Sequence, residues 1–119
     1  MIEVFHLEPF GSLGFRPNVD EVVAALQAGR SVMGLLHYEH VASVDAFELD
    51  EAWQLTNTID RGWWENPQIK PRFKGAGCRS TSVNDIMVGR DGKTWLVAGF
   101  GFEQIHADIA QYLVRKETA

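Results

Sequence analysis

At 119 residues, the chain has the length of one ordinary domain, which excludes two independent hydrophobic cores. Its 45% apolar and 23% charged residues are typical of a globular protein and exclude a disordered or fibrous one. The sequence contains neither the ~18 consecutive apolar residues of a membrane span nor the pattern of a secretory signal. Its single cysteine, Cys78, excludes an internal disulfide. We therefore expect a cytoplasmic protein without membrane contact.

The net charge of −5 is unevenly distributed along the chain. Residues 1–60 contain 2 Lys and Arg against 10 Asp and Glu, whereas residues 61–93 contain 7 against 3. Binding to phosphates needs an excess of cations on the contacting face, so the acidic first half argues against general affinity for nucleic acid. The middle of the chain can still supply a local basic face.

The first predicted elements are a strand and a helix. Residues 2–7 place apolar side chains on both faces of an extended chain, which is typical of a central strand. A loop follows over residues 10–15, and we expect its large apolar side chains to be buried. Asn18 and Glu21 then form a capping box that starts a helix over residues 19–28.

The segment from residue 31 to residue 58 predicts strand and then helix. Residues 31–36 form a strand, and its alternation continues through residues 38–47 with a turn near Glu39. Asp50 is the predicted N-cap of a short helix that runs to Thr58. These elements would be followed directly by the least regular part of the chain.

The last predicted elements are a hairpin and a helix. Residues 86–88 and 94–98 flank the pair Asp91-Gly92, which accepts positive φ and closes a hairpin. Apolar residues at helical spacing from Ile105 onward predict an amphipathic helix from about Glu103 to Arg115. The fold class is therefore α+β, a small and mainly antiparallel sheet with an N-terminal helix, a short middle helix and a C-terminal helix, in a single domain over residues 1–119.

Two runs near the hairpin carry a family resemblance. They are CRSTSVNDI at residues 78–86 and WLVAGFGF at residues 95–102. Together they resemble the C-terminal signature of the YodL-like family, in which a Ser-x-Ser-Val-x-Asp run precedes a hairpin and a Phe-Gly-Phe ending. The likeness covers about residues 50–58 and 78–105. It implies a small uncharacterised domain that is frequent in phage, plasmid and other mobile-element proteins, and it brings no catalytic residues.

Two positions depart from that signature. Asn84 stands where glycine or serine is usual, and Ala98 stands where many members have an acidic residue. The change at position 98 weakens any expectation that this chain keeps a polar site shared by the family.

The sequence offers little support for catalysis or metal binding. His37 and His40 would point to opposite faces of a strand, so we predict no metal site and no cofactor. Cys78 precedes Arg79, but a nucleophile also needs a positioned base and the sequence identifies none. Ser80, Thr81 and Ser82 lack the strand-turn-helix setting of a catalytic serine, so we expect their hydroxyl groups to satisfy a turn.

Residues 62–78 lack periodicity and are predicted to form a long loop, a length that favours function. Its surroundings combine aromatic and cationic side chains, the types enriched at binding hot spots. We predict that a partner is bound by Arg61, Trp63, Trp64, Asn66, Lys70, Arg72, Phe73, Lys74 and Arg79. Alternatively, the same side chains stack on single-stranded nucleic acid, or at least one tryptophan packs in the core.

A second candidate surface is acidic. It consists of Glu39, Asp45, Glu48, Asp50 and Glu51. Such a face can imitate phosphates and occupy a basic groove of another protein, or it can simply keep the protein in solution.

These observations predict a non-enzymatic accessory protein of a mobile element that binds and inhibits a host protein. The expected target is a defence complex, as for anti-CRISPR or anti-restriction proteins, or another complex that handles nucleic acid. Direct nucleic-acid binding is the first alternative, and an enzyme of unknown class is the second. The second would need Cys78 or a histidine beside a carboxylate in a cleft.

Overall fold

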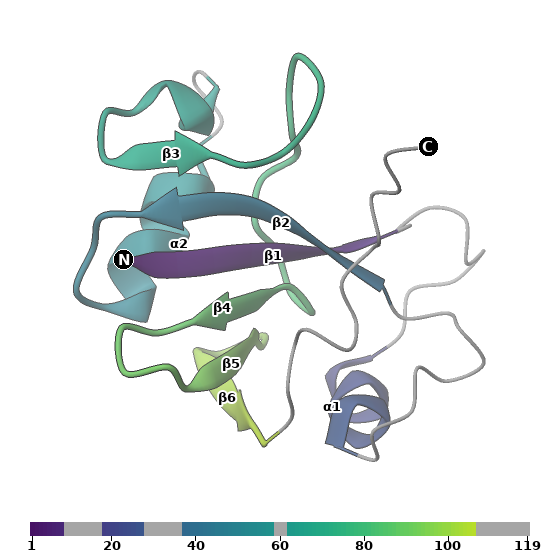
Figure 1. Cartoon of the computed structure of the whole chain (residues 1–119). Coiled ribbons are helices and arrows are strands. Elements are labelled where there is room, and N and C mark those ends of the chain that lie inside the picture. The colour runs from purple at the N-terminus through teal and green to yellow at the C-terminus, as the bar shows by residue number, and fades with distance from the viewer. Residues whose placement is uncertain (9–17, 28–36, 59–61, 107–119) are drawn as a thin grey trace.

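The computed structural model describes residues 1–8, 18–27, 37–58 and 62–106. Within these residues, six antiparallel strands form one sheet in the order β3-β2-β1-β4-β5-β6 (Figure 1). The fold is α+β and mostly sheet, as predicted. Its elements are β1 (Ile2–Glu8), α1 (Val19–Gln27), β2 (His37–Val44), α2 (Leu49–Thr56), the 3₁₀ helix η2 (Trp63–Glu65), β3 (Ile69–Pro71), β4 (Ile86–Val88), β5 (Thr94–Val97) and β6 (Phe102–Ile105).

Strand β1 lies near the middle of the sheet, between β2 and β4, and it is buried on both faces. Ile2 and Val4 pack in a cluster with α2, η2 and Met87. Phe5 and Leu7 point the opposite way and pack with α1. The two helices therefore cover opposite faces of the sheet, and the prediction of a central first strand is confirmed.

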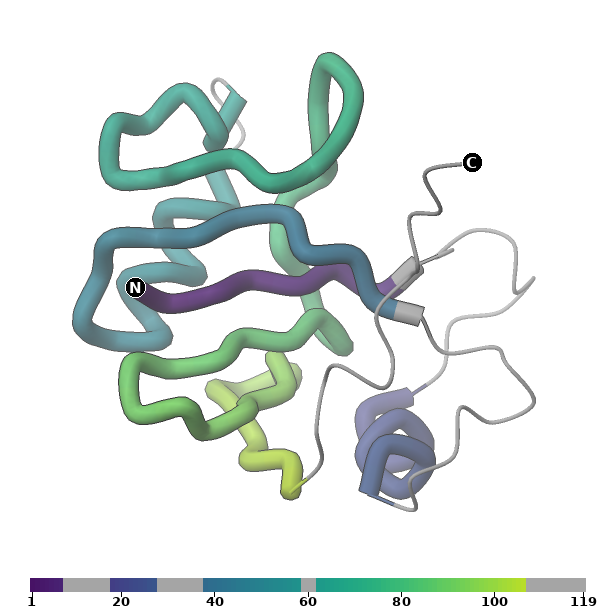
Figure 2. Tube along the Cα trace, viewed as in Figure 1, coloured from purple at the N-terminus to yellow at the C-terminus, as the bar shows by residue number. Residues whose placement is uncertain are grey.

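The segment that connects β3 to β4 runs across one face of the sheet. Because β2 and β1 separate these two strands, residues 72–85 must pass from one side of them to the other, and Figure 2 shows this segment running behind β2 and β1. Cys78 and Phe73, which belong to the segment, pack on the same cluster as α2. This crossing segment contains most of the polar contacts described below.

The capping box of the first helix is confirmed. The Glu21 backbone N–H donates to Asn18 Oδ1 at 2.8 Å, and Asn18 Nδ2 donates to Glu21 Oε1 at 2.7 Å. The predicted cap of the middle helix is wrong by two residues. Helix α2 begins after Glu48, which makes no side-chain cap, and Glu51 instead reaches back to accept from the Phe47 N–H at 3.2 Å.

The region from residue 37 to residue 47 is more regular than predicted. Strand β2 runs through Glu39 without a turn, and its only irregularity opposite β1 is a shift of register between Val4 and Phe5. Phe47 lies beyond the strand and is exposed. The aperiodic loop predicted over residues 62–78 contains η2 and the short edge strand β3.

The hairpin closed by Asp91-Gly92 is confirmed, with Gly92 at a φ of +83° and the Gly89 N–H bonded to Lys93 O at 2.9 Å. The prediction of a helix from about Glu103 is wrong at its start, because residues 102–105 form β6 and pair with β5. The rest of that predicted helix, the strand over 31–36 and the loop over 10–15 lie outside the described residues. Neither of the two described α-helices has the length and apolar character needed to cross a bilayer.

Candidate functional site

Three aromatic rings of the predicted partner-binding set pack on one another. The rings of Trp63, Trp64 and Phe73 meet edge to face, with centroids 5.4–5.6 Å apart. Trp63 is buried and its Nε1–H donates to Arg79 O at 3.0 Å. A Cβ atom at Gly62 would lie 2.5 Å from the Trp64 indole, so this glycine permits the packing. The expectation that at least one tryptophan packs in the core is confirmed.

The polar members of that set are divided between internal and exposed positions. Arg79 is used internally, and Asn66 Oδ1 accepts from the Gln68 N–H at 2.9 Å. Lys70, Arg72 and Lys74 are exposed along and just after β3, and we call them the basic strip. Arg61 lies outside the described residues. A partner-binding role for these side chains stays a prediction.

Asp85 is the centre of a buried polar network. Its carboxylate is fully buried and forms a two-pronged ion pair with Arg79 at 2.6 and 2.7 Å. It also accepts the backbone N–H groups of Leu7 at 2.9 Å and Ser82 at 2.7 Å. Arg79 Nη2 bonds Leu7 O at 3.1 Å. One carboxylate thus joins β1, the crossing segment and the start of β4.

The structure brings Cys78 next to a histidine, which sequence reasoning missed. Cys78 Sγ lies 3.5 Å from Nδ1 of the fully buried His6. His6 Nε2 lies 2.9 Å from Thr81 Oγ1 and 3.8 Å from Asp85 Oδ2. A single proton on Nε2 allows the imidazole to donate to Thr81 and to accept from the Cys78 thiol. The two residues are far apart in the chain, so no local spacing signals the contact.

The electrostatics of this group favour a structural role. Burial lowers the pKa of His6 to about 4, although the Asp85 carboxylate opposes the shift. His6 is therefore neutral at pH 7 and supplies no positive charge to stabilise a Cys78 thiolate, which is the nucleophilic form of cysteine. The hydrogen bonds of His6 instead tie β1 to the crossing segment.

We expect the stability of the fold to fall between pH 6.5 and pH 4 because of His6. The unfolded chain binds a proton at this imidazole with a pKa near 6.5, whereas the folded chain binds it only near 4. Protonation therefore favours the unfolded state by roughly 1.4 kcal/mol for each pH unit in this window. Urea unfolding at pH 6.5, 6.0, 5.5 and 5.0 measures that slope.

The His6→Gln variant is the control for this pH dependence. It keeps a side chain able to hydrogen-bond with Thr81 but has no group that titrates in the window. We expect a lower stability with a flatter pH profile. A profile as steep as that of the wild type would show that other groups cause the loss.

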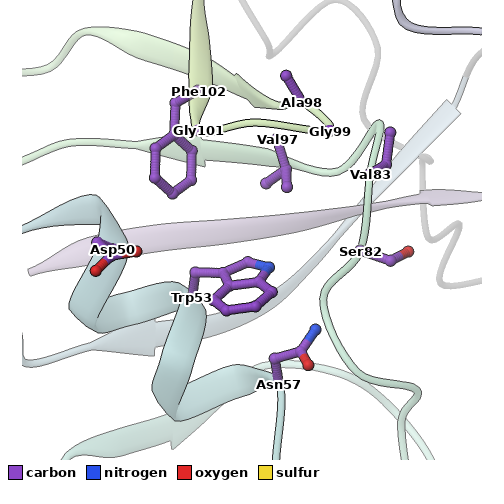
Figure 3. A pocket seen from close by; sticks show the side chains of 10 residues that line it. All are labelled: Asp50, Trp53, Asn57, Ser82, Val83, Val97, Ala98, Gly99, Gly101 and Phe102. Atoms are coloured by element: carbon purple, nitrogen blue, oxygen red, sulfur yellow. The ribbon is translucent and has the colours of Figure 1, made fainter.

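A pocket of about 310 Å³ opens between α2 and the turn that joins β5 to β6 (Figure 3). Trp53 and Phe102 are half-buried and contribute aromatic rings to it. Asp50, Asn57 and Ser82 contribute polar groups, and the Asn57 side-chain amide donates to Thr81 O. The other lining residues are Val83, Val97, Ala98, Gly99 and Gly101. Sequence reasoning noted Asp50 and Phe102 separately but did not bring them together.

Four of the five residues of the predicted acidic surface belong to one short stretch of the chain. Asp45, Glu48, Asp50 and Glu51 are exposed at the end of β2 and the first turn of α2. Glu39 lies near the other end of β2. We call the first four residues the acidic rim, because Asp50 also lines the pocket.

Within the described residues, no group of three His, Cys, Asp or Glu side chains is arranged to hold a metal ion. His40, the second histidine of the His37-x-x-His40 pattern, bonds Glu3 Oε1 through Nε2 at 2.8 Å. Comparisons with protein-family models, with curated proteins and with solved structures find no match.

Proposed function

We propose that the chain is a non-enzymatic protein-binding module that engages its partner through the pocket between α2 and the β5–β6 turn. The observation that carries this proposal is Phe100, which is fully exposed at the tip of that turn. The turn is closed by a hydrogen bond from the Ala98 N–H to Gly101 O at 2.9 Å, with Gly101 at a φ of +79°. A tight turn thus presents a large apolar ring, and the two neighbours of Phe100 in the chain, Gly99 and Gly101, line the pocket.

Phe100 differs from the other exposed phenylalanine of the described chain. Phe47 is 77% exposed, but the Arg90 guanidinium lies 4.2 Å above its ring and covers one face. Exposed aromatic side chains next to a concave surface are typical of binding hot spots, because a partner gains much apolar burial from them. Phe100 and the pocket therefore form the most suitable contact surface of the described residues.

The narrower form of the proposal is that the partner is a host defence or nucleic-acid-handling protein and that binding inhibits it. The support for this is the resemblance to the YodL-like family and the acidic rim, which can enter a basic groove. Retention of such a host protein by the wild-type chain, and its loss with Phe100→Ala, would support the narrower form.

Direct nucleic-acid binding is the weaker alternative. Base stacking needs free aromatic faces. Trp63, Trp64 and Phe73 pack on each other, which leaves mainly the cations of the basic strip for such contacts. Salt-sensitive affinity for single strands that is lost in a Lys70→Ala/Lys74→Ala variant would favour this alternative over the proposed function.

The proposal is tested with a random-peptide display library selected on the immobilised full chain. We expect selected peptides to lose at least about tenfold in affinity with Phe100→Ala and with Trp53→Ala, because each removes an aromatic contact. Phe47→Ala is the matched control and should leave the affinity unchanged. Fluorescence anisotropy of labelled peptides measures these affinities. Peptides that respond to Phe47→Ala but not to Phe100→Ala would place the binding surface elsewhere and contradict the proposal.

A further inference from the structure

The pocket itself has a chemistry that specifies part of its ligand. We infer that the pocket binds a basic side chain, arginine or lysine, of the partner polypeptide, an inference that rests on the proposed function. Three features of the lining carry the inference: a carboxylate at one end, two aromatic rings, and the lack of any positively charged side chain among the lining residues.

The carboxylate and one ring come from the same face of α2. Asp50 is in the first turn of the helix, and Trp53 follows three residues later, so both side chains project toward the pocket (Figure 3). Asp50 is exposed, and its carboxylate accepts one hydrogen bond from Gln54 Nε2 at 3.3 Å. Its carboxylate therefore keeps lone pairs for a cationic group of a partner.

The second ring comes from β6, on the other side of the pocket. Phe102 and Trp53 belong to different elements and lie on either side of the space in Figure 3. The faces of aromatic rings attract cations, and tryptophan does so most strongly. A guanidinium or ammonium group between these rings would meet Asp50 as its counter-ion. The long methylene stem of arginine or lysine would meanwhile cover apolar surface.

The remaining polar side chains of the lining are neutral. Asn57 uses one amide N–H to bond Thr81 O and keeps its second N–H and its side-chain oxygen. Ser82 Oγ accepts from Arg79, and that cation is already paired with Asp85. No lining residue of this pocket carries a positive charge. The Asp50 carboxylate is thus the one formal charge among the lining residues, which favours the cationic side chain of arginine or lysine.

Size and surrounding charge agree with a single side chain of a larger partner. A volume of about 310 Å³ is at the low end for a pocket that encloses a whole small molecule, and it suits one long side chain. The acidic rim extends the negative charge beyond Asp50, which would attract a basic segment and speed association. Phe100, whose neighbours Gly99 and Gly101 line the pocket, would contact other residues of the same partner segment.

The test uses the peptides that depend on Phe100. We expect arginine or lysine to be enriched in them at one position, and replacement of that residue by alanine should weaken binding about tenfold or more. The Asp50→Asn variant should weaken the same peptides about tenfold and reduce the salt dependence of their affinity. Asp20→Asn, which removes an exposed carboxylate of α1 on the opposite face of the sheet, is the control and should change the affinity less than threefold.

A double-mutant cycle makes the assignment specific. Replacing the basic peptide residue by alanine and changing Asp50 to Asn remove the same contact. The fold-loss of affinity with both changes should therefore be clearly smaller than the product of the two separate fold-losses. Independent effects would overturn the inference. Phe100-dependent peptides without an enriched basic residue would overturn it as well while leaving the proposed function in place, whereas the lack of any Phe100-dependent peptide would overturn the proposed function itself.

Free cations separate a polypeptide from a small molecule as the ligand. Titration with free arginine and with spermidine is followed by the NMR signals of the Trp53 indole. We expect binding weaker than that of the selected peptides by at least a hundredfold. Equal affinity for a free amine or guanidine would assign the pocket to a small-molecule ligand and overturn the choice of a protein segment.

Discussion

The Asp85→Asn variant is expected to lose about 3–5 kcal/mol of unfolding free energy, because it breaks a buried ion pair on one side only. The carboxylate is fully buried, and Arg79 reaches it with both terminal nitrogens at 2.6 and 2.7 Å. Neutralising it leaves the guanidinium without its counter-charge and weakens the anchors of two backbone N–H groups. Urea unfolding at pH 7, followed by tryptophan fluorescence, measures the loss.

The chain contains a matched control for this prediction. Asp91 and Lys93 form a surface pair, 4.0 Å apart and each 58% exposed. Asp91→Asn should therefore cost at most about 1 kcal/mol, since solvent screens such pairs. If Asp85→Asn and Asp91→Asn shifted the urea midpoint equally, the buried network would not have the structural role assigned to it. Arg79→Met tests the same pair from the other side and should also be severe, because it leaves a buried carboxylate without its cation.

The features that the sequence predicted correctly depend on residues close together in the chain. The capping box joins Asn18 and Glu21, three residues apart, and the Asp91-Gly92 turn joins two strands that follow one another. Their geometry is set by local backbone chemistry and needs no other part of the fold. The α+β class follows because such local elements alternate along the chain.

The predicted C-terminal helix shows how a non-local partner overrides a local pattern. The spacing of Ile105 and later apolar residues fits a helix, yet residues 102–105 form β6. Gly101, at a φ of +79°, turns the chain back onto the open edge of β5, where the backbone groups of β6 find partners. Strand formation depends on such neighbours, which a periodicity count does not contain.

The candidate sites were the least predictable part of the molecule. Cys78, His6 and Asp85 meet only because the crossing segment passes next to β1. Trp53 and Phe102 line one pocket only because α2 and β6, which are far apart in the chain, both contribute to it. Residue type identified aromatic and charged side chains as important. Residue type alone did not distinguish Trp63, which is buried, from Phe100, which is exposed.

Replacing that internal tryptophan should be among the most damaging single changes in the chain. Trp63→Ala is expected to cost about 3–5 kcal/mol, because it opens a cavity in the cluster that packs on Ile2 and Val4 and removes the bond to Arg79 O. Loss of the bond also leaves a carbonyl oxygen of the crossing segment without this donor. Urea unfolding followed by far-UV circular dichroism measures the effect without relying on the removed indole.

A second variant separates packing from hydrogen bonding at this position and keeps the prediction testable if Trp63→Ala fails to fold. Trp63→Phe retains an aromatic ring against Phe73 but has no N–H, so we expect an intermediate loss of roughly 1–2 kcal/mol. Phe47→Ala removes an exposed ring and should cost less than about 1 kcal/mol. If the chain tolerated Trp63→Ala as well as Phe47→Ala, the Trp63 indole would lie outside the core. Such a result would favour the prediction that the 62–78 segment presents its aromatic side chains to a partner. The ranking of these three variants therefore decides whether the indole of Trp63 acts in folding or in recognition.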